Sequence, residues 1–161
     1  MRWIMEQKAK KYELILKQIE GLIKNEKDWL ANCANSAALL FHSMEDINWA
    51  GFYLYKEGQL VLGPFQGNLA CIRIAMGKGV CGTSAQERKT VIVKDVHEFE
   101  GHIACDAASN SEIVVPIIKG DQLIGVLDID SPLTNRFDEV DGKYLEEFVE
   151  ILNQYCQWTV N

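Results

Sequence analysis

Two apolar runs in the second half of the chain are separated by a short polar segment. Residues 112–118, EIVVPII, and 122–131, QLIGVLDIDS, are joined through KGDQ, which contains Gly120–Asp121. A glycine-containing turn between two runs rich in β-branched residues is a strong signal for an antiparallel hairpin. The core of this chain is therefore expected to be built on an antiparallel sheet.

Helical periodicity flanks the predicted strands on both sides. Apolar residues recur at helical spacing over about 5–24 and again over about 27–42, where Cys33 joins the apolar stripe and is interpreted as a core thiol. A further amphipathic helix closes the chain, with Asp138 as its predicted N-cap and Asp141 in support of that cap. The chain is thus expected to begin and end in helices.

The middle of the chain carries the remaining strands. The aromatic run INWAGFYLY, at 47–55, is followed by a turn and LVLGPF, which predicts a second hairpin. Shorter strands are expected in CIRIA, at 71–75, and in TVIVKDV, with a short helix between them. About five or six hairpin-linked strands between helices predict one α+β domain over residues 1–161. Terminal helices would cover one face of the sheet, and pocket-forming loops would lie on the other.

Charge and composition narrow the classes of partner. The formal charge of −7 disfavours binding to nucleic-acid phosphates. No run has the ~20 apolar residues of a membrane span or the apolar core of a signal peptide, so we expect a cytoplasmic protein that does not enter membranes. The cysteines are odd in number and scattered, which argues against a secreted disulfide framework. His102 and Cys105 lack a second ligand pair, so no metal site is expected.

The end of the last strand places two acids on one face. Because side chains alternate along a strand, Asp128 and Asp130 are expected to share a face with Ile124 and Val126, opposite Leu123. Two carboxylates so close could hold an ammonium group or share a proton, which raises one pKa. A solvated strand end is the plainer interpretation.

Whether Glu112 joins these acids depends on the strand register. A two-residue turn at Gly120–Asp121 would put Glu112 and Asp128 on opposite faces. A three-residue loop, a β-bulge, or a position of Glu112 just before the regular strand would bring the acids together. Periodicity leaves these alternatives open.

A cysteine lies in the loop GHIACDAASNSE, at 101–112, among small residues that allow close backbone approach. Cys105 is either a half-buried thiol or a nucleophile, which would have to be a thiolate. The nearby His102 is interpreted as a surface or hydrogen-bonded residue. Cys71 and Cys81 could face the same side as this loop, so any pair among the three cysteines could form a redox couple.

Two aromatic residues and a helix start complete the candidate site. Trp49 and Tyr53 share one face of their strand, where they either wall an apolar group or fill a core. The helix expected in GKGVCGTSAQER begins with free backbone N–H groups, which favour an anion. These features are compatible with a small-molecule pocket.

Three segments carry a resemblance to a known family. GVCGT at 79–83, DVHEFEGHIACDAASNSEIVVP at 95–116 and GVLDIDS at 125–131 are similar to motifs of the free methionine-(R)-sulfoxide reductases, which are single GAF-type domains. The likeness extends from about residue 25 onward and so leaves out most of the first helix, 1–24. It implies a GAF-like fold and a thioredoxin-dependent oxidoreductase that converts free L-methionine-(R)-S-oxide to methionine without a metal or bound cofactor.

The resemblance also implies roles by position. Cys105 matches the catalytic cysteine, Cys71 the resolving one, and Cys81 a third cysteine that can take part in disulfide exchange. The matching pocket residues are the acids Glu112, Asp128 and Asp130 and the aromatic pair Trp49 and Tyr53. By this analogy Cys105 becomes a sulfenic acid, Glu112 supplies a proton, and thioredoxin or a similar dithiol resets the disulfide.

Two rival hypotheses use the same pocket. A GAF-type sensor or binding module would hold a small ligand without turnover, and a redox sensor would form the disulfide without releasing methionine. A homodimer is compatible with all three interpretations.

Overall fold

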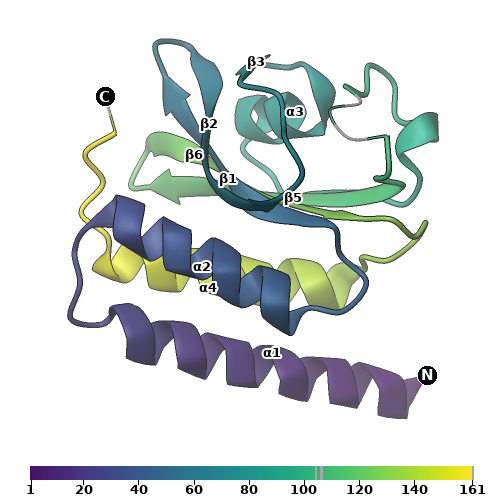
Figure 1. Cartoon of the computed structure of the whole chain (residues 1–161), viewed down its shortest axis with the longest axis horizontal. Coiled ribbons are helices and arrows are strands. Elements are labelled where there is room, and N and C mark those ends of the chain that lie inside the picture. The colour runs from purple at the N-terminus through teal and green to yellow at the C-terminus, as the bar shows by residue number, and fades with distance from the viewer. Residues whose placement is uncertain (104, 106, 161) are drawn as a thin grey trace.

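A six-stranded antiparallel sheet forms the middle layer of the protein (Figure 1). The computed structural model describes residues 1–103, 105 and 107–160. The strands lie in the order β3-β2-β1-β6-β5-β4, and neighbouring strands are antiparallel throughout. The elements are α1 (Arg2–Ile23), α2 (Trp29–Ser43), β1 (Trp49–Lys56), β2 (Gln59–Gly67), β3 (Arg73–Ala75), α3 (Gly79–Glu87), β4 (Val91–Val93), the 3-10 turn η1 (Val96–Glu98), β5 (Ser111–Lys119), β6 (Gln122–Ser131) and α4 (Glu139–Tyr155). The predicted α+β architecture is confirmed.

Three of the helices lie on one side of the sheet, in two layers. Helices α2 and α4 pack on the sheet itself, and α1 packs on α2 and α4 from outside (Figure 1). The terminal helices therefore lie on one side of the sheet, as expected, but α1 forms an outer layer that the sequence did not indicate. The edge strands β3 and β4 have only three residues each, and the four long strands, spaced at about 4.8 Å, are already covered by two helices about 10 Å apart, so α1 packs as an outer layer. Among the described residues, no helix combines the length and the apolar character that a bilayer span requires.

The two faces of the sheet carry separate apolar clusters. On the helix side, Ala50, Phe52 and Leu54 of β1 join the core formed with α1, α2 and α4. Trp49 and Tyr53 lie on the other side, in a smaller cluster with residues of α3. The predicted alternation along β1 is confirmed, and it directs the aromatic pair away from the main core.

The hairpin of β5 and β6 contains a β-bulge. Ile118 lies opposite Leu123 but Ile117 lies opposite Gly125, so Ile124 is an extra residue in β6. One extra residue reverses the alternation of side chains beyond it. The bulge therefore decides which side chains of the two strands share a face.

This bulge settles the register that periodicity left open. The turn has two residues, as Gly120–Asp121 predicted, and the bulge brings Glu112 opposite Asp130. It also corrects one expectation, because Leu123 lies on the side of Trp49 and Tyr53 and Ile124 on the helix side, the reverse of strict alternation. Strict alternation fails there because the bulge separates these two residues from the acids.

A buried carboxylate fastens α1 to the start of α4. Asp138 caps α4 and Asp141 completes a capping box, in agreement with the sequence prediction. The fully buried Asp141 also accepts a hydrogen bond of 2.5 Å from Tyr12 Oη and pairs with Lys8 and Arg136. The outer helix is thus held by charge pairing as well as by its apolar stripe.

Replacing Asp141 by alanine is expected to lower the free energy of unfolding by about 2–3 kcal/mol. Removing one partner of a buried ion pair costs about 3–5 kcal/mol. We expect a smaller loss of stability here because the side chains of Lys8 and Arg136 are 21% and 17% exposed and can be solvated by water once Asp141 is gone. Urea unfolding measures the loss, with the exposed neighbour Glu139→Ala as control. A loss no larger than that of the control would show that the pairing contributes little.

Candidate active site

A small cavity lies on the sheet face opposite α2 and α4. Its volume is about 40 Å³, enough for a few water molecules at about 10–15 Å³ each. Helix α3, the central strands and the loop that carries Cys105 supply its walls. Residues lining it include Trp49, Tyr53, Cys81, Cys105, Glu112, Asp128 and Asp130. The structure therefore brings all but one of the predicted site residues to a single cavity.

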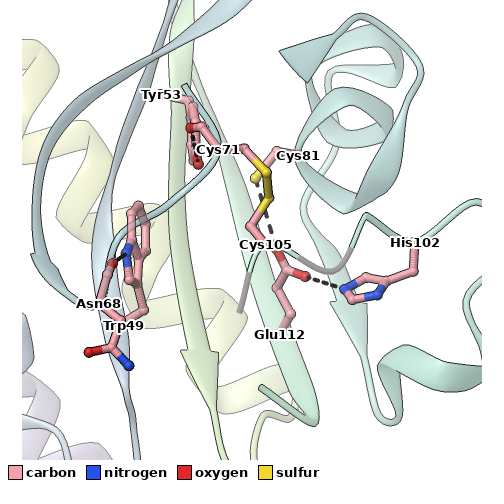
Figure 2. Close-up of a disulfide and its surroundings, with 8 residues drawn as sticks. All are labelled: Trp49, Tyr53, Asn68, Cys71, Cys81, His102, Cys105 and Glu112. Atoms are coloured by element: carbon pink, nitrogen blue, oxygen red, sulfur yellow. Dashed lines mark hydrogen bonds and ion pairs between the residues drawn. A yellow bond between two sulfur atoms is a disulfide. The ribbon is translucent and has the colours of Figure 1, made fainter. Parts of the chain in front are cut away.

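The remaining predicted residue, Cys71, is joined to this cavity by a disulfide with Cys105 (Figure 2). Their Cα atoms are 5.5 Å apart. Cys71 lies in the loop before β3, which begins at Arg73 and not at Cys71 as predicted. Tyr53 Oη donates a 2.9 Å hydrogen bond to the carbonyl oxygen of Cys71. Of the three cysteine pairings that spacing left open, the structure contains the one that the resemblance implied.

Cys81 is a free thiol in the first turn of α3. Its Sγ donates a hydrogen bond to Glu112 Oε1 at 3.9 Å (Figure 2). Burial raises the pKa of the Cys81 thiol well above its usual value, and the carboxylates of Asp128 and Glu112 raise it further. Cys81 therefore carries a proton at neutral pH and is a poor nucleophile in this state.

Three acids converge on the cavity. Glu112 and Asp128 are only 7% and 5% exposed. Burial raises the pKa of Glu112 well above its usual value, and the charges of Asp128 and Asp130 add to this. Burial raises the pKa of Asp128 to about 6. The cluster consequently retains a proton near neutral pH, which a general acid requires.

One oxygen of this cluster is open to a ligand. Asp128 Oδ1 is buried beside the cavity and has no hydrogen-bond partner among the described residues. Buried carboxylate oxygens in folded proteins are nearly always bonded, so an unpaired one beside a cavity suits a ligand N–H or O–H group. Asp128 Oδ1 is therefore placed to accept a hydrogen bond from an ammonium group or a protonated oxygen of a ligand.

His102 lies beside Glu112, a proximity that the sequence interpretation missed. Its Nε2 is 3.8 Å from Glu112 Oε2 (Figure 2). Burial lowers the pKa of His102, and the nearby His97 lowers it further, so the imidazole is neutral at neutral pH. Ten residues separate the two side chains along an irregular loop, and no periodic signal in such a loop could have predicted the contact.

A third aromatic ring, Phe65, packs against the predicted aromatic wall without lining the cavity. Trp49 stacks on Tyr53 and on Phe65, with ring centroids 5.9 Å and 5.1 Å apart, and its Nε1 donates to the carbonyl of Asn68 at 3.1 Å. Phe65 comes close because β1 has a glycine there: a Cβ on Gly51 would lie 2.3 Å from Phe65 Cβ. A glycine inside a strand was the available signal of this close approach.

The other two cysteines lie away from the site. Cys33 and Cys156 are buried in the helix-side core, and Asn32 donates a hydrogen bond of 3.5 Å to Cys156 Sγ. The placement of Cys33 agrees with its interpretation from the sequence as a core thiol. They contribute packing and not chemistry.

Three groups of the cavity are close enough to ligate one metal ion. Among the described residues, ligand atoms of Cys81, Glu112 and Asp128 lie within 4.8 Å of one another. Burial raises the pKa of all three groups, so protons compete with a metal ion for this cluster. The same short distances between Cys81, Glu112 and Asp128 also allow a proton to pass between these groups without a metal ion.

Comparison with known proteins places the chain among GAF domains. The GAF domain family model matches residues 37–154. The chain is 58% identical over 149 residues to Protein YtsP of Bacillus subtilis, with 91% of each chain covered. It is 49% identical over 152 residues to the free methionine-R-sulfoxide reductase of Escherichia coli, covering 94% of this chain and 92% of that protein.

A solved structure extends the likeness to three dimensions. The free methionine-R-sulfoxide reductase from Neisseria meningitidis, in complex with its substrate, is 47% identical and superimposes with a TM-score of 0.89, covering 92% of this chain and 89% of that one. The cavity described above thus belongs to a chain that shares both sequence and fold with substrate-binding relatives.

Proposed function

Because the chain belongs to the free methionine-R-sulfoxide reductase family of GAF-domain proteins, we propose that Cys105 is its nucleophile and Cys71 its resolving cysteine. The protein is an oxidoreductase that reduces free methionine-(R)-sulfoxide to methionine. The observation that supports these roles is the Cys71–Cys105 disulfide beside a cavity lined by three acids. A ligand sensor needs no redox pair at its ligand.

The reaction proceeds in three balanced steps. Cys105, as the thiolate, attacks the sulfoxide sulfur while Glu112 gives a proton to the oxygen, and collapse releases methionine and leaves Cys105 as sulfenic acid. The Cys71 thiol then attacks the sulfenic sulfur, which forms the disulfide and releases water. A dithiol finally reduces the disulfide and is itself oxidised. Burial and the charges of Asp128 and Asp130 raise the pKa of Glu112, so this acid can hold the proton it gives, and no step requires a metal or cofactor.

Substrate orientation follows from the charges of the cavity walls. Asp128, with its unpaired oxygen, and Asp130 suit the ammonium group. The start of α3 suits the carboxylate, because its N-cap Lys78 makes no side-chain cap hydrogen bond and lines the cavity. Trp49 and Tyr53 suit the apolar methyl end. A residue within a peptide carries neither terminal charge.

Thioredoxin or a similar dithiol protein is the proposed reductant. A low-potential dithiol favours reduction of an accessible catalytic disulfide. We place the protein in a reducing compartment, the cytoplasm, because its five cysteines are odd in number and scattered along the chain, unlike a secreted disulfide framework. Both assignments are open to test with the purified protein.

Residues 1–161 are proposed to act as one domain. The outer helix α1 buries Tyr12, Ile15 and Ile19 in the same core as α2 and α4, which supports this view. A homodimer is supported by the exposed Trp3 and Ile4 on α1, which are 70% and 62% exposed.

The deciding assay compares three substrates with dithiothreitol as reductant. Methionine release is expected from the free R epimer, with little from the free S epimer and none from a peptide containing methionine-(R)-sulfoxide, because the peptide lacks both charges. Comparable activity on the peptide would contradict the charge-based orientation. Formation of the disulfide without stoichiometric methionine would instead identify a sensor.

A further inference from the structure

Large apolar side chains are exposed on both sides of the disulfide. Leu69 and Ile72 flank Cys71 in the same loop and are 89% and 68% exposed, and Ile103, which precedes Cys105, is 39% exposed. Single exposed apolar residues are ordinary, but a group of them around one reactive bond indicates a contact surface. Leu69 and Ile72, with Cys71 between them, are called the Cys71 rim below.

The two sulfur atoms of the disulfide differ in their surroundings. Cys105 lines the acid-walled cavity, whereas Cys71 is outside the set of residues that line it. Asp128 and Asp130 line the cavity side of the disulfide, where carboxylates repel the thiolate of an approaching protein. The approach that avoids these acids is the one over the Cys71 rim.

The rim is held at a defined position. Tyr53 Oη bonds the carbonyl oxygen of Cys71 at 2.9 Å, and the carbonyl oxygen of Ile72 accepts from the backbone N–H of Leu62 at 2.9 Å. These bonds fasten the segment to β1 and β2. A fixed sulfur beside fixed apolar side chains forms a docking surface of low ordering cost.

We propose that the Cys71 rim is the docking surface for a dithiol protein reductant, whose thiolate attacks Cys71 Sγ and expels Cys105 Sγ. The proposal rests on the proposed function, in which the disulfide must be reduced in every cycle. The occupant is a protein of the thioredoxin class, with apolar surface around its dithiol. Glutathione fits poorly, because a small anionic peptide gains little from an apolar rim and is repelled by a protein of net charge −7.

The exchange balances as follows. The reductant thiolate forms a new S–S bond to Cys71, the Cys71–Cys105 bond breaks, and Cys105 leaves with the electron pair. The second thiol of the reductant then attacks the reductant sulfur that is bonded to Cys71. This closes the disulfide of the reductant and releases Cys71 as a thiol. The enzyme gains two electrons, the reductant becomes a disulfide, and Cys105 is freed on the cavity side, where the next substrate binds.

Substitution of Ile72 separates docking from catalysis, because Ile72 does not line the cavity. Ile72→Asp is expected to lower kcat/KM for thioredoxin by about tenfold or more while turnover supported by dithiothreitol stays at the wild-type rate. The matched control is Leu30→Asp, on α2, where Leu30 is 53% exposed. Unchanged kinetics with thioredoxin, or an equal loss with both reductants, would overturn the proposal. Absence of wild-type turnover with dithiothreitol would instead refute the proposed function.

The attacked sulfur can be identified in the wild-type protein. A thioredoxin whose second active-site cysteine is replaced by serine cannot resolve the mixed disulfide, so the complex accumulates. Peptide mass mapping is expected to find thioredoxin bonded to Cys71, with Cys105 free for alkylation. A bond to Cys105 would overturn the proposal.

Discussion

Replacing Cys105 by serine is expected to abolish the formation of methionine from free methionine-(R)-sulfoxide, with a loss of at least about 10³-fold. A serine hydroxyl has too high a pKa to become the nucleophile beside three acids, and the other thiol at the cavity, Cys81, is held in its protonated form by its raised pKa. Released methionine can be quantified by mass spectrometry with dithiothreitol as reductant. Thermal unfolding of the variant checks that the fold is intact.

The Cys71→Ser variant tests the division of roles between the two cysteines. Its first reduction is expected to proceed, giving about one methionine per protein without reductant, because Cys71 acts only after the sulfoxide bond is broken. A sulfenic-acid reagent should label Cys105 in this variant and not in the wild type. Cys81→Ser is the control and should keep multiple turnover, since the Cys71–Cys105 pair is intact. Complete loss of the first turnover in Cys71→Ser would contradict the assignment.

Replacing Glu112 by glutamine is expected to lower kcat/KM by about 10²–10⁴-fold, the usual contribution of a general acid. Glutamine keeps the shape of the side chain but cannot give up a proton to the leaving oxygen. The variant should be at least as stable as the wild type at neutral pH, because the neutral amide avoids burying a charge beside Asp128 and Asp130. A loss of activity together with a large loss of stability would point to a structural role.

The pH dependence of Glu112 gives an independent signature. Its pKa is raised in the folded protein, so the acid form is present at low and neutral pH, and the part of the activity that depends on this proton is lost as the pH rises through the raised pKa. The free energy of unfolding changes in the same direction, because a group whose pKa is raised by folding stabilises the folded state at low pH and loses this contribution as the pH rises. For Asp128 the contribution is lost between the unfolded pKa of about 3.9 and the folded pKa of about 6, and for Glu112 it is lost at higher pH. In Glu112→Gln, the loss of stability at the higher pH values should disappear, whereas the exposed control Glu139→Gln should retain it.

The sequence predicted the elements of the fold better than their layering. Periodicity located the helices and the two hairpins because burial against a sheet leaves a regular apolar pattern. The outer position of α1 was missed, since an amphipathic stripe such as Tyr12, Ile15 and Ile19 looks the same whether it covers a sheet or other helices. An apolar stripe on a helix indicates that this face is buried, but it does not indicate whether a sheet or other helices cover it.

For the site, spacing alone identified candidate residues and the family motifs implied their pairing. Asp128 and Asp130 were expected on one strand face. Whether Glu112 joins them depends on a β-bulge in β6, which the turn residues do not indicate. Phe65 and His102 were missed because both contacts are made across the fold, from β2 and from an irregular loop. Such contacts depend on tertiary distance, which alternation and helical spacing do not encode.

The extra residue in β6 makes this hairpin intolerant of changes in length. Deletion of Ile124 would leave the turn and the pairing possible, yet it would turn either Glu112 or the pair Asp128 and Asp130 toward the apolar core beside α4. A carboxyl group left without a partner there costs several kcal/mol. Insertions at the Gly120–Asp121 turn lie outside the bulge and spare the acids. Natural or designed variants should therefore differ in length at the tip of this hairpin and keep the residue count between Ile124 and Asp128.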